Sequence, residues 1–229
     1  MKILYYHGGS GNHGCEAIVR STYKVLQNDK MTLLSKNCHE DEKYEINKIL
    51  SLKKDINTPI NKKSVIYLLS VLETKLFGRT VLTTKQKNKN LLSNIQKNDI
   101  AFSIGGDNYC YSGYEILSDL NYLIHEKGAK TVLWGCSIEP SLLKNKNVVK
   151  DMKRYDLITV RESLSYQGLL DAGVIDNIVL CSDPAFTLDK IDLPLPDNFI
   201  KDNTVGINVS PLIMSCEKML VLQNKILLN

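Results

Sequence analysis

The chain has 229 residues, 43% of them hydrophobic and 24% charged, which is enough to bury the core of one domain, or of one domain and part of another. Lysine and arginine exceed aspartate and glutamate by only four, 29 against 25, and this charge density is too low for a dedicated nucleic-acid-binding protein. The longest apolar stretch, residues 65–72, is about half as long as a bilayer span, so we expect at most peripheral membrane association.

The chain begins with an apolar strand directly after Met1 and Lys2, without a cleavable signal segment, and this predicts a cytoplasmic protein. Its six cysteines form no Cys-x-x-Cys pair and fall near predicted strand ends and turns. In a reducing compartment such cysteines are structural thiols, so we expect neither disulfides nor a metal site.

Short apolar runs alternate with segments of helical periodicity, a pattern typical of a Rossmann-like α/β fold with a parallel sheet and flanking helices. Between residues about 40 and 97 the apolar residues recur at helical spacing among Lys, Asn and Gln, which predicts a helical insert. The predicted strands span residues 2–6, 31–35, 99–104, 131–134, 156–160 and 177–180. The predicted helices span residues 16–27, 115–125, 147–154 and 162–171.

A change of composition at residues 188–203, with Pro194, Pro196 and several aspartates, predicts a linker. It separates a domain of residues 1–187 from a second domain that begins with a strand over 204–209. The roughly 25 residues left, 204–229, are too few to fold as a domain, so we expect an interrupted second domain.

A glycine loop, residues 8–14, follows the first strand and opens a helix, so its backbone amides suit an anionic ligand. It also matches Gly-x-Gly-x-x-Gly, but Ser35 and Lys36 stand where an NAD site has an acid. Lys36 would suit a 2′-phosphate, so an NADP-dependent oxidoreductase is one alternative, and a tight turn without a ligand is another. The binding residues proposed here are Gly9, Gly11, Asn12, His13 and Glu16.

A second glycine turn, Gly105, Gly106, Asp107 and Asn108, ends another predicted strand. The carboxyl ends of parallel strands share one edge of a sheet, so the two glycine loops predict a cleft. Asp107 would accept a proton or a hydrogen bond from a sugar hydroxyl, while Asn108 and Tyr109 would supply donors and an apolar face. Ordinary turn chemistry explains Asp107 and Asn108 equally well.

Three further motifs follow later strands of the predicted sheet. The first motif, residues 135–140, contains Ser137. It follows Trp134, which we assign to the core. Arg161 suits a bidentate contact with a phosphate or carboxylate, or an ion pair with Glu162. Asp183 would face the cleft between domains, or cap the turn before a proline.

In this order the motifs resemble the polysaccharide pyruvyl transferases, with the chain as an apparently truncated N-terminal portion of such an enzyme. The resemblance implies a two-domain arrangement similar to the GT-B glycosyltransferases, phosphoenolpyruvate as donor without a further cofactor, and the sugar of a surface or exopolysaccharide, such as a capsule, as acceptor. It rests on the glycine loop, Gly-Gly-Asp-Asn, Gly-x-Ser-Ile-x-Pro, Val-Arg-Glu-x-x-Ser and Asp-Pro-Ala-Phe, which are residues 8–14, 105–108, 135–140, 160–165 and 183–186.

Pyruvyl transfer requires a general acid, a general base and cations for the donor. From the resemblance we assign catalytic roles to Asp107, Arg161 and Asp183 and substrate contacts to Ser137 and Glu162. Family members usually have Arg-x-His in the C-terminal domain, but this chain has no arginine after Arg161. We therefore expect the donor site to be missing, and a non-catalytic fragment or sugar-binding remnant is the alternative function. Glu139 also replaces the glycine that many relatives have before the proline.

Overall fold

The computed structural model describes residues 1–27, 30–192, 194 and 205. The chain divides into two compact units, residues 1–189 and 190–229. The sheet and the described helices belong to the first unit. Most of the predicted linker, and all of segment 204–229 except Val205, lie outside the described residues, so the GT-B-like second domain stays a prediction.

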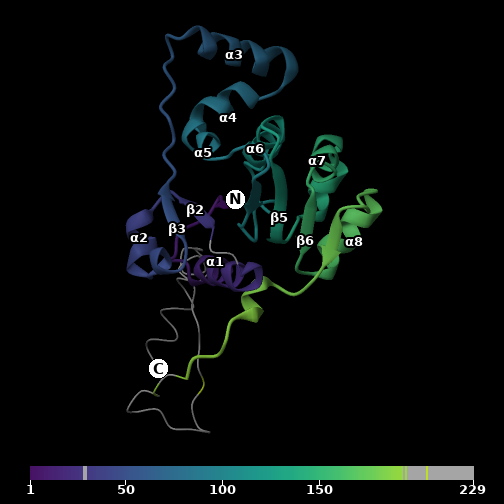
Figure 1. The fold of residues 1–229 in the computed structure, drawn as a ribbon. Helices are drawn as coiled ribbons and strands as arrows, with labels where there is room; N and C mark the ends of the chain where they lie inside the picture. The colour runs from purple at the N-terminus through teal and green to yellow at the C-terminus, as the bar shows by residue number, and fades with distance from the viewer. Residues whose placement is uncertain (28–29, 193, 195–204, 206–229) are drawn as a thin grey trace, which may run out of the picture. The chain divides into compact units, whose positions relative to one another are not determined.

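The first unit is built on one parallel sheet of seven strands, which confirms the predicted Rossmann-like α/β class (Figure 1). Its strand order is β3-β2-β1-β4-β5-β6-β7, so the chain builds outward from β1 to one side and then crosses to the other. The strands are β1 (Lys2–Tyr5), β2 (Met31–Ser35), β3 (Ser51–Lys54), β4 (Ile100–Ser103), β5 (Lys130–Cys136), β6 (Leu157–Val160) and β7 (Ile178–Leu180).

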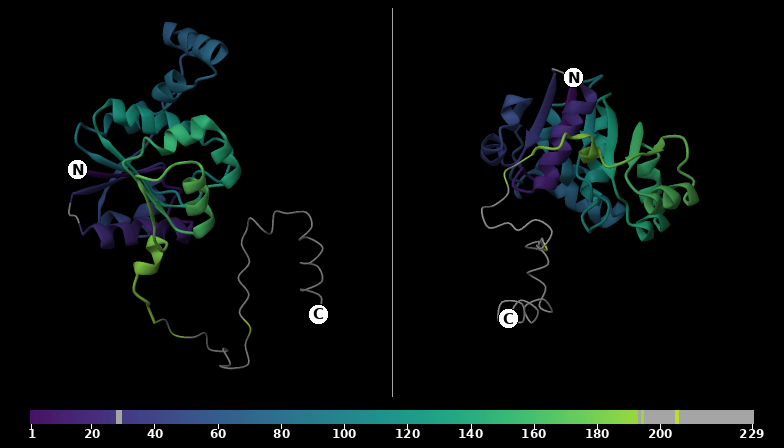
Figure 2. Two further views of the ribbon diagram at one scale, coloured as in Figure 1. Left: turned by 90° about the vertical axis from the view of Figure 1, so that its right-hand side faces the viewer. Right: turned by 90° about the horizontal axis from the view of Figure 1, so that it is seen from below.

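Helices cover both faces of the sheet because its strands are apolar on both faces (Figure 2). Ile3 and Tyr5 of β1 point to one face and pack with α5 and α6, while Leu4 points to the other face and packs with α1. The α-helices are α1 (His13–Leu26), α2 (Cys38–Lys43), α3 (Val65–Phe77), α4 (Val81–Lys87), α5 (Lys89–Ser93), α6 (Glu115–Glu126), α7 (Lys146–Met152) and α8 (Ser163–Asp171). Three 3-10 helices, η1 (Ile46–Lys48), η2 (Pro140–Lys144) and η3 (Pro184–Thr187), complete the described elements.

The predicted helical insert does contain helices, α2 to α5, but it also contributes the edge strand β3. This strand has the sequence Ser-Leu-Lys-Lys, and three of its four side chains are exposed. A single apolar residue gives no strand signal, which is why the sequence prediction missed it. No helix in the described ranges is long and apolar enough to span a bilayer.

Gly135 allows β5 to approach the turn that carries η3. Its φ is +60°, and a Cβ on it would lie 2.7 Å from Cδ of Pro184. We expect Gly135→Ala to lower the free energy of unfolding by about 3 kcal/mol, because a left-handed backbone and contact with a rigid ring are both unfavourable for alanine. Urea unfolding of the purified variant measures this loss.

Gly78→Ala is the matched control for this prediction. Gly78 has nearly the same φ, +62°, but no atom lies within 4 Å of its added Cβ. Gly78→Ala should therefore lower the free energy of unfolding only by the cost of placing alanine in a left-handed backbone, about 1 kcal/mol. Equal losses in the two variants would show that contact with Pro184 contributes nothing.

Candidate functional site

A cavity of about 450 Å³ lies at the carboxyl ends of β1 and β4, where the direction of the strand order reverses. In doubly wound sheets the loops after the two central strands diverge at this point and leave a crevice for ligands. The cavity includes five residues that the sequence predicted, Gly9, Gly105, Gly106, Asp107 and Asn108. Its other lining residues are Tyr6, His7, Gly8, Cys15, Lys36, Asn37 and Tyr111.

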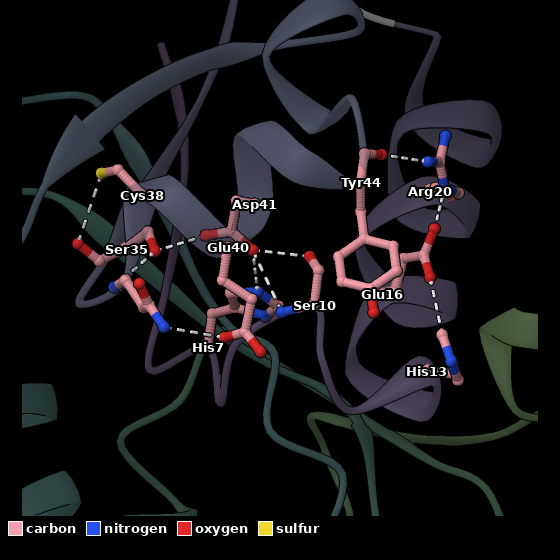
Figure 3. Close-up of polar contacts among 11 residues, drawn as sticks. His7, Ser10, His13, Glu16, Arg20, Ser35, Cys38, Glu40, Asp41 and Tyr44 are labelled. Carbon is pink, nitrogen blue, oxygen red and sulfur yellow. Dashed lines mark hydrogen bonds and ion pairs between the residues drawn. The ribbon is translucent and has the colours of Figure 1, made fainter.

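The glycine loop is held in place by Asp41, a buried residue of α2 (Figure 3). Asp41 Oδ1 accepts hydrogen bonds from Ser10 N at 3.1 Å and Ser10 Oγ at 2.5 Å, and lies 2.9 Å from His7 Nε2. Its Oδ2 accepts a hydrogen bond from Ser35 Oγ at the end of β2. One carboxylate thus joins the first loop to the second strand.

Burial works against the charge of Asp41, but the hydrogen bonds from His7, Ser10 and Ser35 outweigh it and lower the pKa of this carboxyl. The network is almost wholly inside the protein, since the side chains of His7 and Asp41 are 1% and 0% exposed. Such a buried, satisfied network fixes one loop geometry rather than presenting reactive groups.

Tyr6, the residue that follows β1, has a φ of +63°. A bulky side chain rarely adopts this left-handed backbone, and strained residues of this kind cluster at ligand sites. The Lys36 ammonium group lies 5.4 Å from the centre of the Tyr6 ring. Both residues line the cavity, so a cation and an aromatic ring flank its opening beside β2.

Glu40 lies directly over the glycine loop. A Cβ on Gly11 would be 1.7 Å from Glu40 Oε1, and the Asn37 amide donates to Glu40 Oε2 at 3.0 Å. At the start of α1, the Asn12 side chain accepts a hydrogen bond from Gly14 N. A phosphate at these glycines therefore requires that the Glu40 carboxylate first move away.

His13 and Glu16, which the sequence placed at the glycine loop, are not among the cavity-lining residues. Glu16 accepts a hydrogen bond from Arg20 Nε at 2.7 Å and lies 3.1 Å from His13 Nδ1 (Figure 3). The His13 side chain is 76% exposed and its ring meets that of Tyr44 edge-on. Helical spacing pairs these side chains with one another on the surface of α1.

Arg161 joins the ends of three strands. Its Nε donates to Ser137 Oγ at 2.9 Å, its Nη1 donates to Asp183 Oδ2 at 3.0 Å, and its Nη2 donates to Asp107 Oδ1. The structure therefore brings together the three residues to which the sequence assigned catalysis, along with Ser137. A Cβ on Gly106 would lie 2.5 Å from Arg161 Nη1, so any other residue there would require the guanidinium group to shift.

The guanidinium group of Arg161 is committed to these partners. Partial burial disfavours the positive charge of Arg161. The hydrogen bond with Asp183 and the negative charges of Asp107 and Asp183 outweigh this effect and raise the pKa of Arg161. Arg161 does not form the ion pair with Glu162 that the sequence offered as an alternative. Glu162 instead accepts a hydrogen bond from Ser165. Arg161 thus orients two carboxylates rather than holding out a free cation.

Asp183 has a second contact that the sequence left open as an alternative. Its Oδ1 accepts from Ala185 N at 2.9 Å, which caps η3. Asp183 is therefore both a cap and a partner of Arg161. Asp107 differs, since its side chain is 50% exposed and its Oδ2 has no hydrogen-bond partner among the residues that the structure describes.

Tyr109 does not offer the apolar face that the sequence suggested. It is completely buried, and its hydroxyl donates to Asp151 Oδ2 at 2.6 Å within the core. Asn108 turns back on its own strand and donates to Ser103 Oγ at 2.9 Å. The exposed ring at the cavity belongs to Tyr111, which is 65% exposed.

Trp134 is partly buried and packs against the core, as predicted, with its ring edge-on to that of Phe102 and the ring centres 5.8 Å apart. Cys15 lines the cavity, and burial raises the pKa of its thiol, which keeps it in the protonated form. Among residues 1–27, 30–192, 194 and 205, no group of three or more His, Cys, Asp or Glu side chains is placed to hold a metal ion.

Comparison with known families gives a match to the family model for polysaccharide pyruvyl transferase over residues 12–226. The match continues past the predicted linker, so it covers nearly the whole chain and not only an N-terminal domain. No curated protein matches the chain.

Proposed function

Because the chain belongs to the polysaccharide pyruvyl transferase family, we propose that it transfers a pyruvyl group from phosphoenolpyruvate to a sugar of a surface polysaccharide. In this proposal the acceptor sugar occupies the cavity between the ends of β1 and β4. The observation that carries the proposal is the position of Asp107, which lines this cavity. One oxygen of its carboxylate accepts a hydrogen bond from Arg161, and the other oxygen has no hydrogen-bond partner among the described residues.

The side of the cavity next to the glycine loop, away from Lys36, suits a neutral, hydroxyl-rich ligand better than an anion. Two carboxylates, Glu40 over the glycine loop and Asp107 on the opposite loop, repel phosphate but accept hydrogen bonds from hydroxyl groups. The exposed ring of Tyr111 supplies an apolar surface of the kind on which a sugar ring packs. These features favour the acceptor over phosphoenolpyruvate as the occupant.

The reaction proceeds by addition and then elimination. A general acid donates a proton to the methylene carbon of phosphoenolpyruvate, and the adjacent carbon becomes electrophilic. One sugar hydroxyl attacks that carbon and loses its proton to a base. A second hydroxyl then displaces inorganic phosphate to close the ketal, and the departing phosphate takes up the proton of this hydroxyl. We assign the base to Asp107, which lines the cavity and whose Oδ2 has no hydrogen-bond partner among the described residues.

Arg161 acts as a positioning residue in this proposal. It holds Asp107 Oδ1 and so leaves the other oxygen of the carboxylate available, and its contact with Asp183 keeps the guanidinium group in place. Lys36 is the cation lining the cavity in the described part of the chain, and we expect it to meet the anionic donor at the opening.

The purified full chain, phosphoenolpyruvate and a panel of sugar acceptors test this proposal. We expect inorganic phosphate to be released only when an acceptor is present, together with a ketal product identified by mass spectrometry. Saturable sugar binding without phosphate release would instead support the alternative, a sugar-binding protein without turnover. Tight binding of NADPH, measured by titration, would support the oxidoreductase and contradict the transferase.

A further inference from the structure

Helix α3, Val65–Phe77, carries an apolar stripe on its outer side. The stripe has the i, i+3, i+4, i+7 spacing that ordinarily faces a protein core, yet every member is between 43% and 73% exposed. It consists of Val65, Leu68, Leu69, Leu72 and Leu76.

The orientation of α3 is set by its opposite side, which packs on α4. Ser70, on that side, is only 2% exposed, and Glu73 Oε2 accepts a hydrogen bond from Leu82 N at 2.9 Å. Both figures show α3 beyond α4, on the side away from the sheet (Figures 1 and 2). Among the described residues the apolar stripe is therefore directed away from the sheet, and no described element covers it.

The segment of the chain that carries this stripe is rich in basic residues. Between residues 61 and 90 the only acid is Glu73, whose carboxylate is bound to the backbone of α4. Seven basic residues against one acid give this short segment a larger positive charge than the +4 of the whole chain. The basic residues are Lys62, Lys63, Lys75, Arg79, Lys85, Lys87 and Lys89, and all of them are exposed.

From the exposed apolar stripe and the excess of positive charge in the segment that carries it, we propose that α3 docks on the surface of an anionic lipid bilayer. The helix has 13 residues and would be about 20 Å long, too short to cross a bilayer but suited to lying in the plane of its headgroups. The leucines then enter the boundary of the acyl chains while the lysines meet anionic headgroups. This inference goes beyond the transfer reaction and does not depend on it.

Sedimentation of the full chain with lipid vesicles tests the docking. We expect binding to vesicles of equal amounts of phosphatidylcholine and phosphatidylglycerol, much weaker binding to phosphatidylcholine alone, and a decrease with added salt. The triple variant Leu68→Gln/Leu72→Gln/Leu76→Gln should bind the mixed vesicles about a hundredfold more weakly. Unchanged binding of this variant would overturn the proposal.

A matched control replaces three exposed aliphatic side chains elsewhere, Val25→Gln/Leu164→Gln/Ile175→Gln. These changes should leave vesicle binding unaltered, and an equal loss would overturn the assignment to α3. An exposed apolar helix could also be covered by a second copy of the chain. Light scattering without lipid tests this alternative by measuring the molecular mass in solution. A dimer that the α3 variant converts to a monomer would also overturn the lipid assignment.

Discussion

An Asp107→Asn variant should fold normally and transfer pyruvyl groups with a kcat about a thousandfold lower than that of the wild type. Asparagine can still accept the hydrogen bond from Arg161 through its amide oxygen, so the contacts among the strand ends persist. It cannot take a proton from a sugar hydroxyl, so the loss falls on the chemical step. Steady-state kinetics with varied acceptor measure kcat and KM, and circular dichroism checks the fold.

The control for this prediction is Asp176→Asn, which removes an equal charge from an exposed site outside the cavity. Its kcat should match that of the wild type. An Asp107→Asn enzyme with kcat within about threefold of wild type would rule out Asp107 as the general base. A rise in KM with unchanged kcat would reduce its role to acceptor binding.

Asp41→Asn should lower the free energy of unfolding by about 3 kcal/mol at neutral pH. The carboxylate of Asp41 faces donors on both of its oxygens, from Ser10 on one side and Ser35 on the other. An amide must present its own donor group to one of them, which leaves buried groups unpaired. Urea unfolding measures the loss, and Glu42→Gln, an exposed neighbour on α2, should have little effect.

The effect of Asp41→Asn should depend on pH. The pKa of Asp41 is lowered in the folded protein, so its contribution is fully present above the ordinary aspartate pKa of about 3.9 and is lost as pH falls through the lower folded value. The stability difference between wild type and variant should therefore be constant near neutral pH and shrink well below pH ~4. A difference that grew on acidification would contradict a stabilising carboxylate.

Most of the sheet could be predicted because its central strands are buried on both faces. Runs such as residues 31–35 and 156–160 are apolar enough to be recognised without tertiary information, and β2 spans the predicted residues. The edge strand β3 could not be found, because its side chains are mostly exposed and its place depends on pairing with β2.

The candidate site could be predicted to the extent that it follows from sheet geometry. Asp107, Arg161 and Asp183 each follow a strand, and parallel strands bring their carboxyl ends to one edge. The contact of Asp41 with the glycine loop was missed because it depends on how α2 docks, about 30 residues further along the chain. The burial of Tyr109 was missed for a similar reason, since its partner Asp151 lies on α7.

The central position of β1 has a consequence for synthesis of the protein. This strand leaves the ribosome before the other strands of the described sheet, yet one of its two neighbours, β4, ends at Ser103. At about 5–20 residues per second, the edge of β1 that β4 will cover stays open for roughly 3–14 s after β2 has emerged. During that interval the nascent chain exposes an apolar strand edge of the kind that recruits chaperones or pairs with another chain, and pairing over so long a separation favours slow folding.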